Sequence, residues 1–277
     1  MSTIQKGSSE KKMGNRLTKS YQKQVLVLAV RAGELMMRNG AELYRVEDTI
    51  ERICQACGIP YVEVFATPTG IIVSTDSGGD DGEVITKVRR IRSNSVDLSR
   101  ISELNSFSRI FTTTEYSPAK GMEKLREITA MKPFNIWVRL LGAGCVAASF
   151  SAALAPTLLN TLFAFIVGVL SYAFSMLLAR YDINYFMNGM TCCGMAALIT
   201  MICSSTGLID DYSAIIIGTI MLFVPGAAIT NSMRDLLSGD MLSGIAKMAE
   251  ALLVAVAQAA GVGIVLKIWF MMGGLQS

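Results

Sequence analysis

Residues 136–179 read IWVRLLGAGCVAASFSAALAPTLLNTLFAFIVGVLSYAFSMLLA, with Arg139 as the single charged residue. A helix needs roughly 20 mainly apolar residues to cross the ~30 Å hydrocarbon core of a bilayer. This stretch is long enough for two such helices, and Pro156 marks a tight hairpin between them because proline cannot continue a helix. The run lacks the polar stripe at helical spacing that a soluble helix shows. This stretch therefore predicts helices that span a lipid bilayer.

Five segments meet the same requirement, and they all lie in the second half of the chain. Residues before about 135 hold 20 of the 25 Lys and Arg and 16 of the 22 Asp and Glu, so the first half is water-soluble in character. We therefore expect an integral membrane α-helical bundle of about five transmembrane helices, residues 135–277, preceded by a small cytoplasmic α+β domain, residues 17–134. The expected spans are approximately Ile136–Ala155, Thr157–Ala179, Tyr185–Ser205, Tyr212–Ile229 and Gly244–Phe270.

Positive charges indicate the orientation of these spans, because cytoplasmic loops carry an excess of Lys and Arg. Four of the five basic residues after 135 fall on the side of the basic first half, and only Lys267 lies near the opposite end. We expect a multi-pass protein of the cell (inner) membrane with its N-terminus in the cytoplasm and its C-terminus outside. The four residues are Arg139, Arg180, Arg234 and Lys247.

The first half alternates between two periodicities. Residues 1–16 are rich in Ser, Lys and Gly and predict a disordered tail. Apolar residues at helical spacing then predict helices, and β-branched runs around Pro68-Thr69-Gly70 predict a hairpin. The expected helices are Tyr21–Asn39, Leu43–Cys57, Leu98–Phe107 and Pro118–Met131, and the expected strands are Tyr61–Thr67, Ile71–Thr75 and Glu83–Ile91.

Composition excludes several kinds of chemistry. The chain has no histidine, which removes Ser-His-Asp and Cys-His nucleophiles and histidine-ligated metals. Cys54 and Cys57 form a CxxC without a second pair to complete a zinc site, so packed thiols are favoured over redox chemistry. The acidic loop Ser77–Glu83 does not match a calcium-binding spacing and is expected to be a solvated turn. We expect no cofactor, no metal, no catalytic residue and, at a net charge of +3, no nucleic-acid partner.

The most informative stretch is Pro225 to Glu250, PGAAITNSMRDLLSGDMLSGIAKMAE. Pro225 and Gly226 lie inside the fourth apolar segment, where they should interrupt the helix. Interrupted membrane helices often bind substrates or ions with their freed backbone groups. The alternative is a proline kink without function, followed by a cytoplasmic loop and a helix cap.

Polar side chains gather after this interruption. Arginine can bind a carboxylate through two parallel hydrogen bonds, and Asp or Glu can hold an ammonium group or a proton. An acid within an apolar run, such as Glu250, costs several kcal/mol unless it is paired or neutral. In the third segment, three polar residues share one helical face, which could join helices or line a substrate path. The expected substrate- or ion-binding residues are Pro225, Gly226, Thr230, Asn231, Arg234, Asp235, Asp240, Glu250, Asn184, Asn188 and Thr191.

Four motifs in order resemble the threonine/serine exporter family, in particular the larger subunit of its split-chain branch. They are GAELYRVEDTIERICQACGI, FATPTGIIVS, VDLSRISELNSFSR and PGAAITNSMRDLLSGDMLSG, within a likeness that covers about Gln24 to Phe270. The matching positions in the soluble half are Gly40, Glu42, Arg45, Glu47, Pro68 and Thr69, and near the membrane they are Pro225, Gly226, Asn231, Arg234, Asp235, Gly239, Asp240 and Gly244.

This resemblance implies a secondary transporter subunit that exports threonine and serine or a dicarboxylate such as succinate. It also implies a small membrane subunit of the same family as partner, because the family has about ten membrane helices and this chain has about five; a higher oligomer is a further expectation. Two other functions compete with it: a membrane-tethered enzyme that uses the charged residues of one helix, and a sensor or scaffold. The charged helix residues are Glu42, Arg45, Glu47, Asp48 and Glu51, a spacing more typical of a solvated, ion-paired face.

Overall fold

The computed structural model describes residues 19–76, 84–92, 95–114, 116–181, 183–207, 209 and 211–273. The predicted tail 1–16 and the acidic loop Ser77–Glu83 lie outside the described residues, as does Asp210. The chain forms two compact units. The N-terminal unit contains the chain up to Lys132 together with Asn231–Ala246, and the membrane unit contains Pro133–Thr230 and the chain from Lys247 onward. Residues 231–246, which the sequence placed with the membrane half, therefore belong with the N-terminal unit.

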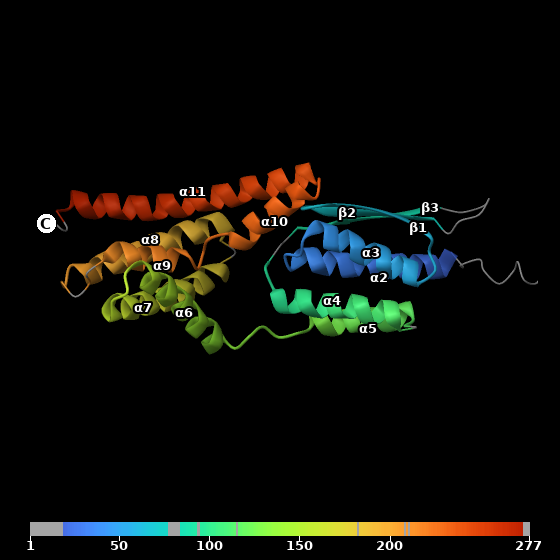
Figure 1. Ribbon diagram of the computed structural model, residues 1–277, viewed down its shortest axis with the longest axis horizontal. Helices are drawn as coiled ribbons and strands as arrows, with labels where there is room; N and C mark the ends of the chain where they lie inside the picture. Colours follow the sequence, from blue (N-terminus) through green and yellow to red (C-terminus); the bar gives the residue numbers. More distant parts are fainter. Residues whose placement is uncertain are drawn as a thin grey trace, which may run out of the picture. The chain divides into compact units, whose positions relative to one another are not determined.

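The N-terminal unit has three layers. Figure 1 shows a sheet on one side of helices α2 and α3, with helices α4 and α5 on the other side. The buried apolar side chains of all three layers form one continuous core. The elements are α2 (Lys19–Arg38), α3 (Leu43–Ala56), β1 (Tyr61–Thr67), β2 (Gly70–Asp76), β3 (Val84–Arg90), α4 (Leu98–Thr113) and α5 (Pro118–Thr129).

The sheet is antiparallel with strand order β1-β2-β3, and its register is set by a two-residue turn. Pro68 and Thr69 form this turn between the paired residues Thr67 and Gly70, as the hairpin prediction required. Side chains alternate between the two faces of a strand. In β2, Ile71 and its alternate neighbours are buried against the helices, while the opposite face of the sheet is exposed.

A buried carboxylate joins α2 to the sheet. The Glu34 side chain is 2% exposed and pairs with Arg89 of β3 at 2.9 Å and with Arg31 at 2.9 Å. Burial disfavours the charged form, but hydrogen bonds from Arg89 and Arg31 outweigh it and lower the pKa of Glu34. The basic cluster of β3 thus contributes at least one arginine to internal pairing.

Helix α4 is longer than its predicted range. The sequence placed its end near Phe107, whereas the helix continues to Thr113. The inward face of the helix continues through Phe111, which is 3% exposed and packs against Phe107 at 5.5 Å between ring centroids. Tertiary burial therefore extends a helix whose intrinsic hydrophobic periodicity is weak.

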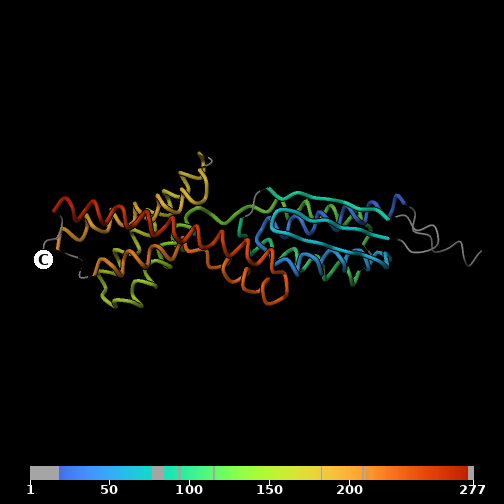
Figure 2. Tube along the Cα trace, turned by 90° about the horizontal axis from the view of Figure 1, so that it is seen from above, coloured from blue at the N-terminus to red at the C-terminus, as the bar shows by residue number. Residues whose placement is uncertain are grey.

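The long apolar helices lie in the membrane unit, which α11 enters at Lys247. Among the described residues, four helices are long and apolar enough to cross a membrane, namely α6, α7, α8 and α11. In Figure 2, the Cα traces of α6, α7, α8 and α9 lie beside one another, coloured from yellow-green to orange, and that of α11 is red. The bounds are α6 (Ile136–Leu154), α7 (Leu158–Ala179), α8 (Tyr185–Ser204), α9 (Tyr212–Ile220), α10 (Gly226–Leu237) and α11 (Met241–Met271).

The predicted fourth span, Tyr212–Ile229, is interrupted. Helix α9 ends at Ile220 after nine residues and α10 begins at Gly226. The proline ring clashes with the carbonyl four residues earlier, so Pro225 prevents helical continuation from Met221 onward. The break predicted at Pro225-Gly226 is present, but it starts several residues before the proline. The first, second, third and fifth predicted spans each correspond to a single helix. The fourth predicted span is a short helix followed by a turn.

Close helix packing in the membrane unit depends on glycines. A Cβ at Gly261 of α11 would lie 2.1 Å from the carbonyl oxygen of Met190 in α8, and one at Gly218 of α9 would lie 2.6 Å from the carbonyl oxygen of Ala147 in α6. Such distances are below any real contact. Small residues at these crossings let helix backbones approach in lipid, where packing replaces the hydrophobic effect.

Replacement of Gly261 by alanine should therefore destabilise the packing of α11 on α8. We expect Gly261→Ala to lower stability by about 1–3 kcal/mol, the range for overpacked sites, and to lower the apparent Tm of the purified chain in detergent. Gly263→Ala is the matched control, because a Cβ there meets nothing within 4 Å. Equal melting temperatures for the two variants would contradict the observed close approach.

Candidate functional site

Two motifs that lie about 190 residues apart in sequence meet within the N-terminal unit. Arg234 of α10 forms an ion pair with Glu42, the residue that precedes α3. Glu42 also pairs with Arg45 at 3.2 Å, so one carboxylate is shared by two guanidinium groups. The Asn231 side chain donates a hydrogen bond to the carbonyl oxygen of Gly40 at 3.1 Å. These contacts attach α10 to the start of α3.

A second carboxylate of α3, Glu47, lies within electrostatic reach of Asp235 and Asp240. Glu47 accepts a hydrogen bond from the backbone N–H of Ala66 at 2.8 Å, which joins α3 to β1 just before the Pro68-Thr69 turn. Burial raises the pKa of Glu47, and the charges of Asp240, Glu51 and Asp235 raise it further, although the Ala66 hydrogen bond acts in the opposite direction. Glu47 is thus a carboxyl group whose proton affinity depends on residues of α10 and the turn that follows it.

The backbone around these groups requires glycine. Gly40 has a φ of +88° and Gly239, two residues after the end of α10, has a φ of +94°, in the left-handed region that other residues rarely adopt. Gly244 lets the first turn of α11 lie against α10, since a Cβ there would be 2.5 Å from Leu236 Cγ. Gly239 and Gly244 thus shape the chain on either side of Asp240, whose charge acts on Glu47 of α3.

We call the group Glu42, Arg45, Glu47, Asn231, Arg234, Asp235 and Asp240 the α3–α10 cluster. Its carboxylates outnumber its guanidinium groups, and Asp235 is fully buried. Arginines of this kind bind carboxylates, and crowded carboxylates bind protons or ammonium groups. Among the described residues, no group of three Cys, Asp or Glu is arranged to hold a metal ion. The cluster thus brings together groups able to pair with a carboxylate, an ammonium group or a proton.

The remaining predicted residues lie elsewhere in the chain. Pro225 and Gly226 form the break between α9 and α10, and the Thr230 hydroxyl donates to the Gly226 carbonyl oxygen at 3.0 Å. Glu250 is exposed on α11. These four positions belong to the membrane unit, whereas the α3–α10 cluster belongs to the N-terminal unit.

The polar residues of α8 have separate roles. The Asn188 side chain bonds to Ser175 of α7, accepting from its hydroxyl at 2.9 Å and donating to its carbonyl oxygen at 3.3 Å. Asn184 caps the start of α8, and the Thr191 hydroxyl donates to the Met187 carbonyl oxygen at 2.7 Å. Asn188 thus joins two helices, as one of the two sequence interpretations expected.

Sequence reasoning missed Gln258. Its side-chain amide donates to the carbonyl oxygen of Phe223, inside the break between α9 and α10, at 2.6 Å. Gln258 is 3% exposed, and a Cβ at Gly189 of α8 would touch it at 3.4 Å. A signal was available, because Gln258 is the single glutamine in the five predicted spans.

Comparison with known proteins decides the family. The family profile described as "Putative threonine/serine exporter" matches residues 27–269. The chain belongs to the threonine/serine exporter family. No solved structure matches it.

The chain covers different shares of two relatives. It is 27% identical over 250 residues to a "Probable threonine/serine exporter" of Mycobacterium tuberculosis, covering 89% of this chain and 46% of that protein. It is 23% identical over 258 residues to a "Probable succinate transporter subunit" of Escherichia coli, covering 91% of this chain and 97% of that protein. The exporter-family chain therefore spans about half the length of the first relative and nearly all of the second.

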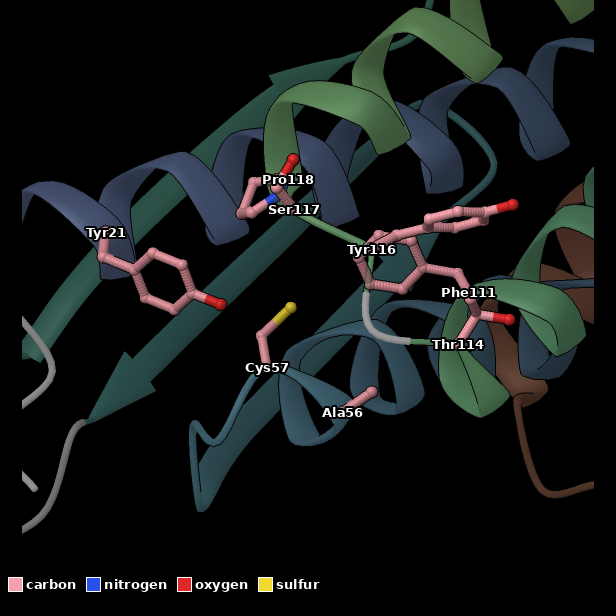
Figure 3. Close-up of a pocket in the computed structure, with 8 residues that line it drawn as sticks. All are labelled: Tyr21, Ala56, Cys57, Phe111, Thr114, Tyr116, Ser117 and Pro118. Atoms are coloured by element: carbon pink, nitrogen blue, oxygen red, sulfur yellow. The ribbon is translucent and has the colours of Figure 1, made fainter.

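The exporter-family chain also has a cavity of about 350 Å³ at the ends of α3 and α4, lined by aromatic and small polar side chains (Figure 3). The side chain of Cys57 points into it, with the Tyr21 hydroxyl beside the sulfur. Burial raises the pKa of Cys54 to about 12 and also raises that of Cys57. Thiolates are the reactive form of cysteine, so this CxxC is poorly suited to redox chemistry.

The raised pKa of Glu47 predicts a pH dependence of stability. A carboxyl group whose pKa is higher in the folded state stabilises the fold below its unfolded pKa, and that contribution is lost as pH rises through the folded pKa. We expect Glu47→Gln to be more stable than the wild type at pH 7 and to lose less stability between pH 4.5 and 7. Thermal unfolding at several pH values measures this. Glu103→Gln, at an exposed position of α4, is the control and should follow the wild type.

Proposed function

We propose that this chain is one subunit of a secondary transporter that exports small polar metabolites, either threonine and serine or a dicarboxylate such as succinate. The observation that carries the proposal is the α3–α10 cluster, in which Arg234, on the helix that begins at the interrupted span, pairs with Glu42. A helix of a membrane transporter that ends in a paired arginine offers a binding group for a carboxylate. All the candidate substrates carry one.

In the proposed mechanism, a substrate carboxylate replaces Glu42 as the partner of Arg234. Glu42 keeps Arg45 as its second partner at 3.2 Å, so the exchange leaves no buried charge unpaired. Glu47 and Asp240 supply carboxylates for the substrate ammonium group or for a coupling proton. Release of Arg234 from Glu42 loosens α10 from α3, and binding is thereby coupled to movement of a membrane-connected helix.

Glu250 has a proposed role at a subunit interface. Its side chain is exposed on α11 beside apolar residues, and an ionised carboxylate facing hydrocarbon is unfavourable by several kcal/mol. A cationic group of a partner chain, or a bound proton, would remove this cost. We place the N-terminal unit in the cytoplasm and the C-terminus outside, on the distribution of positive charges.

The partner is proposed to be a short membrane protein of the same family. The first relative has more than twice the aligned length in one chain, whereas the E. coli relative, named as a subunit, is covered almost completely. We infer that a second chain supplies the remaining helices of the carrier.

Substitution of Arg234 tests the binding group. In cells that lack the endogenous gene, Arg234→Ala should reduce efflux of the substrate at least tenfold, and Arg234→Lys should retain part of it because the charge remains. Arg52→Ala is the matched control, since it removes an exposed arginine that pairs with Asp48 on α3. Efflux of threonine, serine and succinate is measured from preloaded cells. Wild-type efflux in Arg234→Ala would exclude Arg234 from the transport path.

Reconstitution tests the requirement for a partner. The chain purified alone and the complex captured from native membranes in mild detergent are placed in substrate-loaded vesicles. We expect efflux only from vesicles that hold the complex. Efflux at the same rate from vesicles with this chain alone would show that it is a complete carrier.

A further inference from the structure

The outward face of the sheet exposes several large apolar side chains. It is the face opposite α2 and α3, and its large side chains are between 42% (Ile72) and 68% (Val88) exposed. Strand pairing places Phe65, Ile72 and Val88 in one row across β1, β2 and β3. Contiguous apolar surface of this kind marks interaction sites. The outward face consists of Tyr61, Glu63, Phe65, Thr67, Gly70, Ile72, Ser74, Asp76, Val84, Thr86, Val88 and Arg90.

The polar residues of this face allow it to be covered. Ser74 and Thr86, which are paired across β2 and β3, hydrogen-bond to each other through their hydroxyls at 2.8 Å. A hydroxyl that already has a partner is not left unsatisfied when water is removed. The hydroxyls of Ser74 and Thr86 can therefore be covered at little cost.

Two charges of opposite sign lie on either side of the apolar row. Glu63 is on β1, one row before it, and Arg90 is on β3, one row after it, and both are exposed. The residue midway between them is Ile72, on the central strand. A two-fold axis that lies in the plane of the face, passes through Ile72 and is perpendicular to the line from Glu63 to Arg90 would place Glu63 of each copy over Arg90 of the other.

We propose that the outward sheet face binds the same face of a second copy of this chain. An isologous contact needs a self-complementary surface, and the diagonal of Glu63, Ile72 and Arg90 supplies one. Strand spacing of about 4.8 Å and a rise of about 3.4 Å per residue give a crossing angle of about 70° between the strands of the two copies, near the orthogonal class of sheet packing. An anionic lipid surface fits less well, because Glu63 and Asp76 offset the positive charge of Arg90.

The size of the contact agrees with a membrane-anchored pair. Twelve side-chain positions at sheet spacing cover about 400 Å² on each copy, which is less than stable soluble dimers bury. Both copies are held in the same bilayer, and this raises their effective concentration. The contact is therefore expected between copies that are anchored in the same membrane. It would be weak between N-terminal units that are separated from their membrane helices.

Cross-linking of the full chain in membranes tests the contact. Packed sheets are about 10 Å apart, beyond the reach of a disulfide, so a short bis-maleimide is used on Ile72→Cys. Two copies with different tags are expressed together, and the cross-linked product is probed for both tags. Glu123→Cys, exposed on α5 on the opposite side of the unit, is the control, and the wild type measures the background of native cysteines.

We expect a product with both tags at least fivefold above the Glu123→Cys control. Adding Glu63→Arg should reduce it at least threefold by placing like charges together, and adding Arg90→Glu to that variant should restore it. Every variant is first checked for wild-type membrane yield and Tm. Cross-linking no greater than the control, or a product with another protein in place of the second copy, would overturn the proposal. Insensitivity to both charge reversals would overturn the two-fold arrangement.

Discussion

In hydrocarbon, every backbone polar group needs a partner, and this constraint governs the membrane unit. The break between α9 and α10 removes helical hydrogen bonds from several carbonyl groups. Gln258 of α11 donates to the carbonyl of Phe223 within this break at 2.6 Å. Gly189 and Gly261 allow α8 and α11 to come close enough for Gln258 to fit between them. The buried amide of Gln258 thus supplies a hydrogen bond that the interrupted helix lacks, and the glycines make room for this amide.

The N-terminal unit combines an apolar core with the charged α3–α10 cluster. Its three layers share one apolar core, and arginines stabilise the charged form of the buried Glu34 carboxylate there. The α3–α10 cluster differs from that arrangement. Burial raises the pKa of Glu47 and the nearby carboxylates raise it further, whereas hydrogen bonds from Arg89 and Arg31 overcome burial and lower the pKa of Glu34. Groups with perturbed proton affinity tend to mark functional sites, and transport is the function that the family supports.

Much of this architecture could be predicted from local pattern. The strands, the Pro68-Thr69 turn and four long membrane helices follow from periodicity and length, and the family followed from motifs. The attachment of residues 231–246 to the N-terminal unit could not be predicted, because the Arg234–Glu42 pair joins positions far apart in sequence. The early end of α9 follows from a proline clash with Met221, a rule that applies four residues before the proline. Gln258 was missed because a single amide in an apolar helix changes the mean hydropathy little.

The N-terminal unit is built from two pieces of chain that are separated by most of the membrane unit. During synthesis, the first piece leaves the ribosome long before Asn231 and Arg234 exist. Helices α6 to α9 are synthesised while Glu42 still lacks its distant arginine. Completion of the N-terminal unit therefore has to follow the synthesis of residues 133–230, which belong to the membrane unit.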